Sequence, residues 1–201
     1  MESWKINEYT LEYDDDSHIY LVDGVIVPSV TQLLKSKFGN KYDLVNPAVL
    51  EQAAIRGTAI HEAIEKYCKT GEDDGSREVH DFNFLRTRHN FEVLANEVPI
   101  IISDKEPIAA GRLDLVLSIN GHKAIADIKT TAVLDKEYLY YQLNLYRVGY
   151  IQSYGGEIEE LYGVHLKNEK RKFVNIPINS ELVWGLINGF TNDYQRNDRR
   201  G

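Results

Sequence analysis

Cysteine is nearly absent from this sequence, because Cys68 is the single one in 201 residues. One thiol excludes an internal disulfide framework and any site in which several cysteines hold zinc or an iron–sulfur cluster. Apolar runs of membrane-spanning length are also missing, and the N-terminus lacks a basic segment followed by an apolar one. We therefore expect a cytoplasmic protein that has no membrane partner.

An excess of positive charge is missing as well, since 31 acidic residues against 23 lysines and arginines give a net charge of −8. A nucleic-acid-binding domain usually carries a basic surface, so this balance counts modestly against one. Acidic groups around a metal ion would still contribute to the net charge while the ion neutralised them locally. The basic residues are clustered, and one short cluster contains Lys170, Arg171 and Lys172.

The chain is long enough, with 43% hydrophobic residues, for one domain with a substantial core. No internal repeat or low-complexity linker divides the sequence. We expect a single domain over residues 1–201, with an N-terminal hairpin in 1–30, a core over 47–180, and a C-terminal helix with a basic tail over 181–201.

Hydrophobic periodicity and turn residues predict a mixture of helices and strands. Helices are expected at 30–34 behind the N-cap residue Ser29, at 47–69 with an interruption near Gly57, and at 76–95, 137–154 and 180–197. Strands are expected as a hairpin within 9–28 and at 97–102, 110–119, 122–129, 161–166 and 172–178. This order predicts an α/β fold in which a central mixed β-sheet is flanked by helices on both faces.

The hairpin expected around Asn120-Gly121 carries the strongest chemical signal. This pair lies between two apolar runs, which is typical of a two-residue β-turn. Such a turn places Asp114 directly opposite Asp127, with Lys129 on the same side of the sheet. Two carboxylates held face to face repel each other unless a cation or a proton lies between them. The pattern therefore predicts a divalent metal ion with oxygen ligands.

The other side of the same hairpin is apolar and suits a core. It carries Leu113, Leu115, Leu117, Ala124, Ala126 and Ile128. The alternative interpretation is a surface hairpin whose polar side is merely solvated, and the motifs described next favour a site.

The segment HEAIE, which begins at His61, places a histidine and a carboxylate one helical turn apart. A zinc protease helix needs a second histidine at the fifth position, where this chain has Glu65, so that class is excluded. Taken alone, such a pair is more often a surface pair than a metal site.

Several further motifs occur in a fixed order: VPSVTQLL, RGTAIHEAIEKY, Glu97, GRLD, DIKT and YYQLNLY. Together they resemble the PD-(D/E)xK nuclease superfamily, specifically its RecB-like branch, over about residues 9 to 150. That branch includes phage-type exonucleases, CRISPR adaptation nucleases and the mitochondrial genome maintenance exonuclease. The resemblance implies a restriction-endonuclease-like core. Leu113 stands where the name-giving proline would be, a departure that this branch commonly tolerates.

The resemblance also implies a role for each matching position. The metal ligands would be His61, Asp114, Asp127 and the backbone carbonyl of Ile128, with Glu97 or Glu65 for a second ion. The catalytic residues would be Asp114, Asp127 and Lys129, bordered by Gln142 and Tyr146 of the Q-x-x-x-Y motif. The substrate would contact Arg56, Gln142, Tyr146 and the cluster Lys170, Arg171 and Lys172. The four cysteines of the cluster-bearing members are absent, so no iron–sulfur cluster is expected.

The implied function is a nuclease that uses one or two Mg²⁺ or Mn²⁺ ions and leaves 5′-phosphates. It would act as an exonuclease on DNA ends or single strands, in phage or bacterial recombination or repair. Its partners would be DNA, further copies in a ring, or a recombination protein. Alternatives are a catalytically silent nucleic-acid-binding or assembly subunit with the same fold, an RNA-directed nuclease, and a structural protein with an acidic face. The sequence leaves open whether Lys129 is a base or a charge stabiliser.

Overall fold

The computed structural model describes residues 1–39, 45–167 and 170–198, with side chains up to residue 190. In chain order the strands are β1 (Glu2–Ile6), β2 (Tyr9–Asp14), β3 (Ile19–Val22), β4 (Val25–Val27), β5 (Phe91–Asp104), β6 (Glu106–Ile119), β7 (His122–Lys129), β8 (Glu160–Lys167) and β9 (Lys170–Ile176). The helices are α1 (Val30–Phe38), α2 (Pro47–Thr70), α3 (Arg77–His89), α4 (Lys136–Tyr154) and α5 (Ser180–Asp198). The end of the expected basic tail, residues 199–201, lies outside the described residues.

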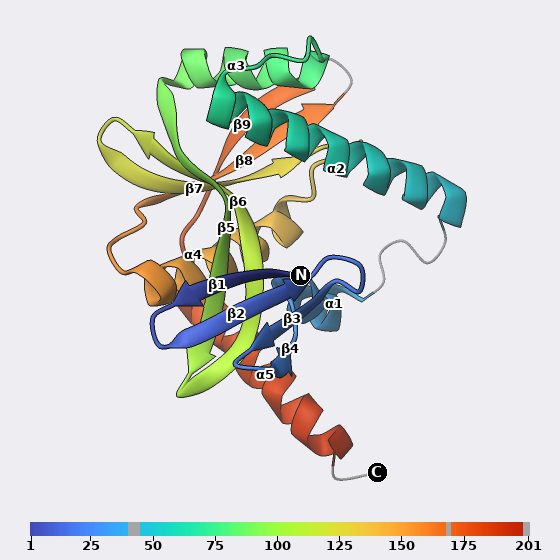
Figure 1. The fold of residues 1–201 in the computed structure, drawn as a ribbon, viewed down its shortest axis with the longest axis vertical. Coiled ribbons are helices and arrows are strands. Elements are labelled where there is room, and N and C mark those ends of the chain that lie inside the picture. Colours follow the sequence, from blue (N-terminus) through green and yellow to red (C-terminus); the bar gives the residue numbers. More distant parts are fainter. Residues whose placement is uncertain (40–44, 168–169, 199–201) are drawn as a thin grey trace.

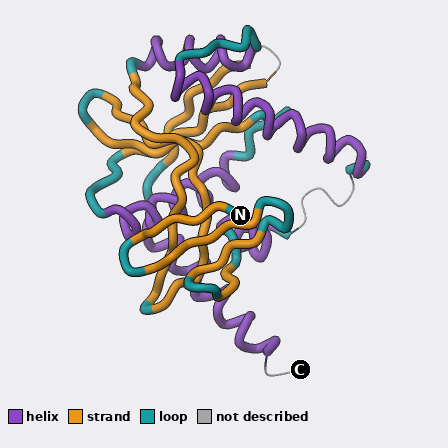
Figure 2. Tube along the Cα trace, viewed as in Figure 1, coloured by secondary structure: helices purple, strands orange, loops and turns teal. Residues whose placement is uncertain are grey.

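The strands form a four-stranded sheet in the order β1-β2-β3-β4 and a five-stranded sheet in the order β5-β6-β7-β8-β9 (Figures 1 and 2). In the larger sheet β7 and β8 are parallel because α4 connects them, and the other pairs are antiparallel. One apolar cluster joins this sheet to α2 and α3, and another joins it to α1, α4 and α5. The expected mixed sheet with helices on both faces is therefore confirmed. Among the described helices, none is long and apolar enough to cross a membrane.

The N-terminal hairpin belongs to a larger antiparallel sheet than the sequence predicted. Asn7 adopts a positive φ of 52°, and the resulting tight turn adds β1 to the edge of β2 without a glycine. Apolar side chains of this sheet pack against Ile101 and Ala110 of the long strands β5 and β6. The backbone N–H of Ala110 also donates to the carbonyl of Pro28 (3.0 Å). The small sheet therefore lies against the end of the β5–β6 hairpin near its turn, as Figure 1 shows.

Two predicted helix boundaries in the middle of the chain are wrong. Gly57 does not interrupt α2, which runs unbroken from Pro47 to Thr70, and a Cβ there would meet Thr130 Oγ1 at an ordinary contact distance of 3.4 Å. The next helix ends at His89 rather than at residue 95. Asn90 adopts a left-handed φ of 51° and its N–H donates to the Arg86 carbonyl, which closes the helix.

The N-cap of α1 is confirmed. The Ser29 side chain accepts from the N–H of Gln32, whose side chain accepts from the N–H of Ser29. The helix runs beyond residue 34 to Phe38, and it ends where the N–H of Gly39 donates to the Lys35 carbonyl.

The register predicted for the central hairpin is confirmed. Ile119 pairs with His122, and Asn120 and Gly121 adopt positive φ angles of 52° and 86°. Both faces of this hairpin are buried, however, so the side that carries Asp127 is covered by α4 rather than by solvent.

One residue of the expected apolar side lies in the other cluster. The expected core side is confirmed for Leu115, Leu117, Ala124, Ala126 and Ile128, which lie in one apolar cluster with residues of α2 and α3. Leu113 packs instead with α4. It pairs with Val98, next to Glu97, whose left-handed φ of 48° disrupts the regular alternation of β5 at this point.

Close packing of α4 on the sheet depends on Gly149. A Cβ there would lie 2.4 Å from Cδ1 and 3.2 Å from Cγ1 of Ile100 and 3.1 Å from Cγ1 of Ile102, whereas nothing lies within 4 Å of one added at Gly185 of α5. We expect Gly149→Ala to lower the free energy of unfolding by about 1–3 kcal/mol through overpacking. The control Gly185→Ala should raise it by up to about 1 kcal/mol through helix propensity. Urea denaturation of both variants tests this, and equal stabilisation would contradict it.

Candidate metal centre

Three carboxylates lie side by side on three adjacent strands. The pairs that flank Glu97 on β5 place it beside Asp114 on β6, and the hairpin register places Asp114 beside Asp127 on β7. Neighbouring strands are about 4.8 Å apart, so these acidic groups share one small region of the sheet. The left-handed backbone of Glu97 is a conformation that costs about 1 kcal/mol or more and that often marks functional sites.

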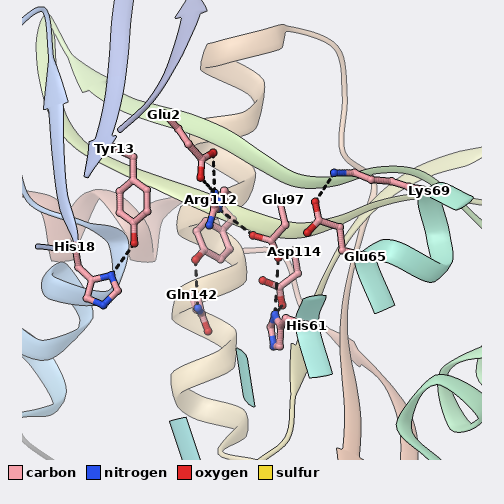
Figure 3. Close-up of polar contacts among 11 residues, drawn as sticks. Glu2, Tyr13, His18, His61, Glu65, Lys69, Glu97, Arg112, Asp114 and Gln142 are labelled. Carbon is pink, nitrogen blue, oxygen red and sulfur yellow. Dashed lines mark hydrogen bonds and ion pairs between the residues drawn. The ribbon is translucent and has the colours of Figure 1, made fainter. Parts of the chain in front are cut away.

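A histidine from α2 completes this group. His61 Nδ1 lies 3.6 Å from Asp114 Oδ2 and 3.9 Å from Glu97 Oε1 (Figure 3). One ligand atom from each of the three residues lies within 4.8 Å of the others. An imidazole and carboxylate oxygens together suit a first-row divalent cation. These residues can therefore hold a metal ion.

Asp127 and Lys129 lie next to this group. Lys129 Nζ lies 2.5 Å from Asp127 Oδ2, an ion pair that lacks the angles of a hydrogen bond. Only 2% of the Asp127 side chain is exposed. Asp114 Oδ2 accepts the backbone N–H of Ile128 (2.6 Å), which orients the carboxylate. The buried Asp127 oxygen thus meets one ammonium and, among the described residues, no hydrogen-bond donor in good geometry.

Burial is the main cause of the raised pKa values of Asp114 and Asp127. It raises the pKa of Asp127 to about 6, against the opposing effect of Lys129. Burial also raises the pKa of Asp114, although His61 and Lys129 counteract it. Both shifts show that the protein's own cations compensate the negative charge incompletely. A divalent ion would supply the missing charge.

For the two cationic side chains, His61 and Lys129, the neighbouring carboxylates rather than burial raise the pKa. Burial alone would lower the pKa of His61, but Asp114 and Glu97 outweigh it and raise that pKa to about 9. Burial would likewise lower the pKa of Lys129, but Asp127 and Asp114 raise it above its usual value. Lys129 is therefore an ammonium in the metal-free protein.

Gln142 and Tyr146 approach the centre from α4. Both are buried, and Gln142 Nε2 lies 3.4 Å from the Tyr146 hydroxyl. Burial and the charges of Asp127 and Asp114 raise the Tyr146 pKa well above its usual value, so the phenol remains neutral. A Cβ at Gly111 would lie 3.2 Å from the Tyr146 ring, so the glycine of GRLD lets this ring lie against β6.

Arg112 is a site residue that the sequence interpretation missed. Its Nε lies 3.0 Å from Glu97 Oε2, and its Nη1 donates to both carboxylate oxygens of Glu2 (3.2 and 3.1 Å; Figure 3). Its guanidinium lies 5.4 Å from the centre of the Tyr13 ring. The signal was its place in GRLD, two residues before Asp114. Arg112 connects the N-terminal sheet to the metal centre.

A pocket of about 510 Å³ opens onto His61 and Glu97. Its charged lining consists of Glu2, Asp15, Glu62, Glu65 and Glu97 together with His61 and Arg112. This excess of carboxylates suits a cation.

The other expected substrate contacts lie in other surroundings. Arg56 Nη2 lies 2.6 Å from Glu78 Oε1, in an ion pair between α2 and α3. Arg171 pairs with Asp81 (2.7 Å) and lies 3.6 Å from the centre of the Phe84 ring. Their guanidinium groups are engaged by the fold rather than directed at the metal centre. Lys170 and Lys172 line a separate pocket.

Comparison with known proteins identifies no family for this chain. No family model matches it, and no curated protein matches it. A solved structure described as the crystal structure of SSO0001 is similar, with 19% identity and a TM-score of 0.47 over 80% of this chain and 72% of that one. A likeness at this level assigns no activity, so the function rests on the site itself.

The positions of Glu97 and Glu65 favour Glu97 over Glu65 as a metal ligand. Glu97 lies in the His61 group, whereas Glu65 pairs with Lys69 on α2. We expect saturating Mn²⁺, used as a probe, to raise the melting temperature of the wild type by about 5 °C or more, because it binds the folded state. Glu97→Gln should reduce this shift by at least half, and the matched Glu65→Gln should leave it unchanged. Equal shifts in both variants would contradict the assignment.

The raised pKa of His61 makes the metal-free protein sensitive to pH. The folded state holds the His61 proton up to about pH 9, whereas the unfolded chain releases it near 6.5. Its stabilisation is therefore complete below pH 6.5 and is lost as the pH rises to 9. Urea titrations in EDTA should show the wild type losing on the order of 1–3 kcal/mol over this range relative to His61→Gln. Parallel pH profiles would contradict the shift.

Proposed function

We propose that this protein is a metal-dependent DNA nuclease that hydrolyses phosphodiester bonds and leaves 5′-phosphates. One observation carries the proposal: Asp114, Asp127 and Lys129 lie together with His61 and Glu97 in one partly buried centre. The motif order that resembles the RecB-like branch of the PD-(D/E)xK superfamily supports the same activity. In this assignment His61, Glu97, Asp114 and Asp127 hold Mg²⁺ or Mn²⁺.

Hydrolysis of a phosphodiester requires an attacking water, stabilisation of the developing charge and a leaving oxygen. A bound divalent ion polarises the phosphate and lowers the pKa of a water ligand. The donor set fits Mg²⁺ through its carboxylates and Mn²⁺ through its imidazole as well. Ile128 contributes its N–H, which orients the Asp114 carboxylate, and its carbonyl as a further ligand remains a prediction.

Lys129 supplies a fixed positive charge beside the scissile phosphate. Its ammonium is held by Asp127 at 2.5 Å, and 22% of its side chain is exposed, so a substrate oxygen can reach it. From this position it donates a hydrogen bond to a phosphate oxygen or to the attacking water. Such preorganised donors lower the barrier because their dipoles do not have to reorient during the reaction.

Action on DNA ends or single strands, alone or as a ring of copies, follows from the family resemblance. A silent nucleic-acid-binding subunit and an RNA-directed nuclease are the rival functions. The complete set of His61, Asp114, Asp127 and Lys129 favours an active enzyme, since a subunit that only binds has no need of a buried lysine–aspartate pair.

The decisive assay is degradation of end-labelled linear and circular DNA, single- and double-stranded, with Mg²⁺, Mn²⁺ or EDTA. We expect loss of linear DNA only, in the presence of metal only. Lys129→Ala should lower the rate by about 10²–10³-fold, the cost of removing one transition-state donor. Lys123→Ala is the matched control, because Lys123 lies near the other end of the same strand and should leave the rate unchanged.

Each other outcome of this assay is informative. Cleaved circles would indicate an endonuclease. Cleavage of RNA but not DNA would keep the nuclease chemistry and change the proposed substrate to RNA. Binding without cleavage under every metal, or equal rates for the wild type and Lys129→Ala, would overturn the proposed chemistry.

A further inference from the structure

A row of basic side chains leads away from the metal centre across three strands. Lys129 on β7 pairs with His165 on β8, and His165 pairs with Lys172 on β9. Residues at paired positions point to the same face of a sheet, here the face that α4 covers. At a strand spacing of about 4.8 Å, Lys172 lies about 10 Å from Lys129 along the sheet.

The outer part of this row lines a second pocket, of about 230 Å³. Its polar lining consists of Lys136, His165, Lys170 and Lys172, and no carboxylate lines it. This composition is unusual in a chain with a net charge of −8. None of these three lysines makes an ion pair with any described residue, whereas Arg171 between two of them pairs with Asp81.

His165 gives this pocket a buried polar group without a partner. The residue is 2% exposed, and its Nε2 donates to the Thr131 carbonyl (2.7 Å). Because a carbonyl only accepts, Nε2 carries the hydrogen. Nδ1 is buried and meets no hydrogen-bond partner among the residues described. A buried polar atom in this state indicates a ligand or an ordered water.

We propose that this pocket binds a backbone phosphate of a nucleic-acid strand whose neighbouring phosphate lies at the metal centre. The assignment rests on the proposed nuclease function, because it takes the occupant of both sites to be one strand. Lysine ammonium groups are point charges that attract phosphates without reading bases, so the pocket positions the strand independently of its sequence. The His165 imidazole lines the same pocket, and a water held by the bound phosphate would supply the partner that Nδ1 lacks. Thr131, which accepts the hydrogen bond from His165, follows Lys129 by two residues, so one short segment connects the pocket to the proposed catalytic lysine.

The test is equilibrium binding of a fluorescent single-stranded oligonucleotide, with Ca²⁺ in place of Mg²⁺, at several salt concentrations. We expect Lys170→Ala combined with Lys172→Ala to raise Kd by about 10-fold or more and to reduce the slope of log K against log salt by about 1.4. Both lysines are exposed, so the variant should fold. The control Lys5→Ala with Lys123→Ala makes the same change in net charge outside the pocket and should leave Kd within about 2-fold.

His165→Gln tests the buried group separately. Glutamine can keep the hydrogen bond to the Thr131 carbonyl but removes Nδ1, so we expect weaker binding at an unchanged melting temperature. Equal losses in the two double-lysine variants would overturn the pocket, since they would reveal diffuse electrostatic attraction. A polyglutamate peptide that competes as well as the oligonucleotide would also overturn it, in favour of an acidic protein partner.

The two proposals fail in different ways. Lysine-dependent binding of the oligonucleotide without cleavage of any nucleic acid would preserve the phosphate pocket and refute the nuclease. Cleavage that depends on Lys129, with Kd unchanged in the Lys170 and Lys172 variant, would preserve the nuclease and refute the pocket.

Discussion

Repulsion among buried carboxylates is the constraint on which the centre of this structure depends. Glu97, Asp114 and Asp127 occupy neighbouring positions on three strands, and burial raises the pKa of both aspartates. Lys129 and His61 offset part of this charge and hold their own protons more tightly as a result. A protein selected only for stability would replace such a group by apolar side chains. Its presence, together with a left-handed backbone at Glu97, is typical of a site that can bind a ligand.

The fold holds this costly group together from several directions. The β5–β7 sheet fixes the spacing of the acids, α2 brings His61 and α4 closes the other side with Gln142 and Tyr146. Glycines at points of close approach make this possible, since Gly111 makes room for the Tyr146 ring. The N-terminal sheet takes part through Arg112, which bridges Glu97 and Glu2. That small sheet is therefore part of the site as well as of the core.

Much of this arrangement could be predicted from local sequence. The Asn120-Gly121 turn determines the hairpin register, and with it the neighbours of Asp114, because only a few turn types join strands by two residues. The continuity of α2 through Gly57 could not be predicted, because a glycine inside a helical pattern can equally mark the end of a helix and no local residue decides between the two. The ion-pair partners of the two arginines could not be predicted either, because the fold brings them together from distant positions in the sequence. Arg56 pairs with Glu78, and Arg171 pairs with Asp81. His165 belongs to none of the sequence motifs, and the β7–β8 register reveals its position beside Lys129.

The register also bears on how a chain with a net charge of −8 could take the nucleic-acid substrate that we propose. His61 and Glu97 line the acidic pocket, and His165, Lys170 and Lys172 line the basic one, with Lys129 next to His165 on the neighbouring strand. Charge is therefore separated over a few strands rather than averaged over the surface. The phosphates of a nucleic-acid strand would meet the lysines of the basic pocket at one end and a bound metal ion at the other. A net negative charge is therefore compatible with the proposed substrate, because a local field over about 10 Å, near the screening length in physiological salt, decides where a polyanion would lie.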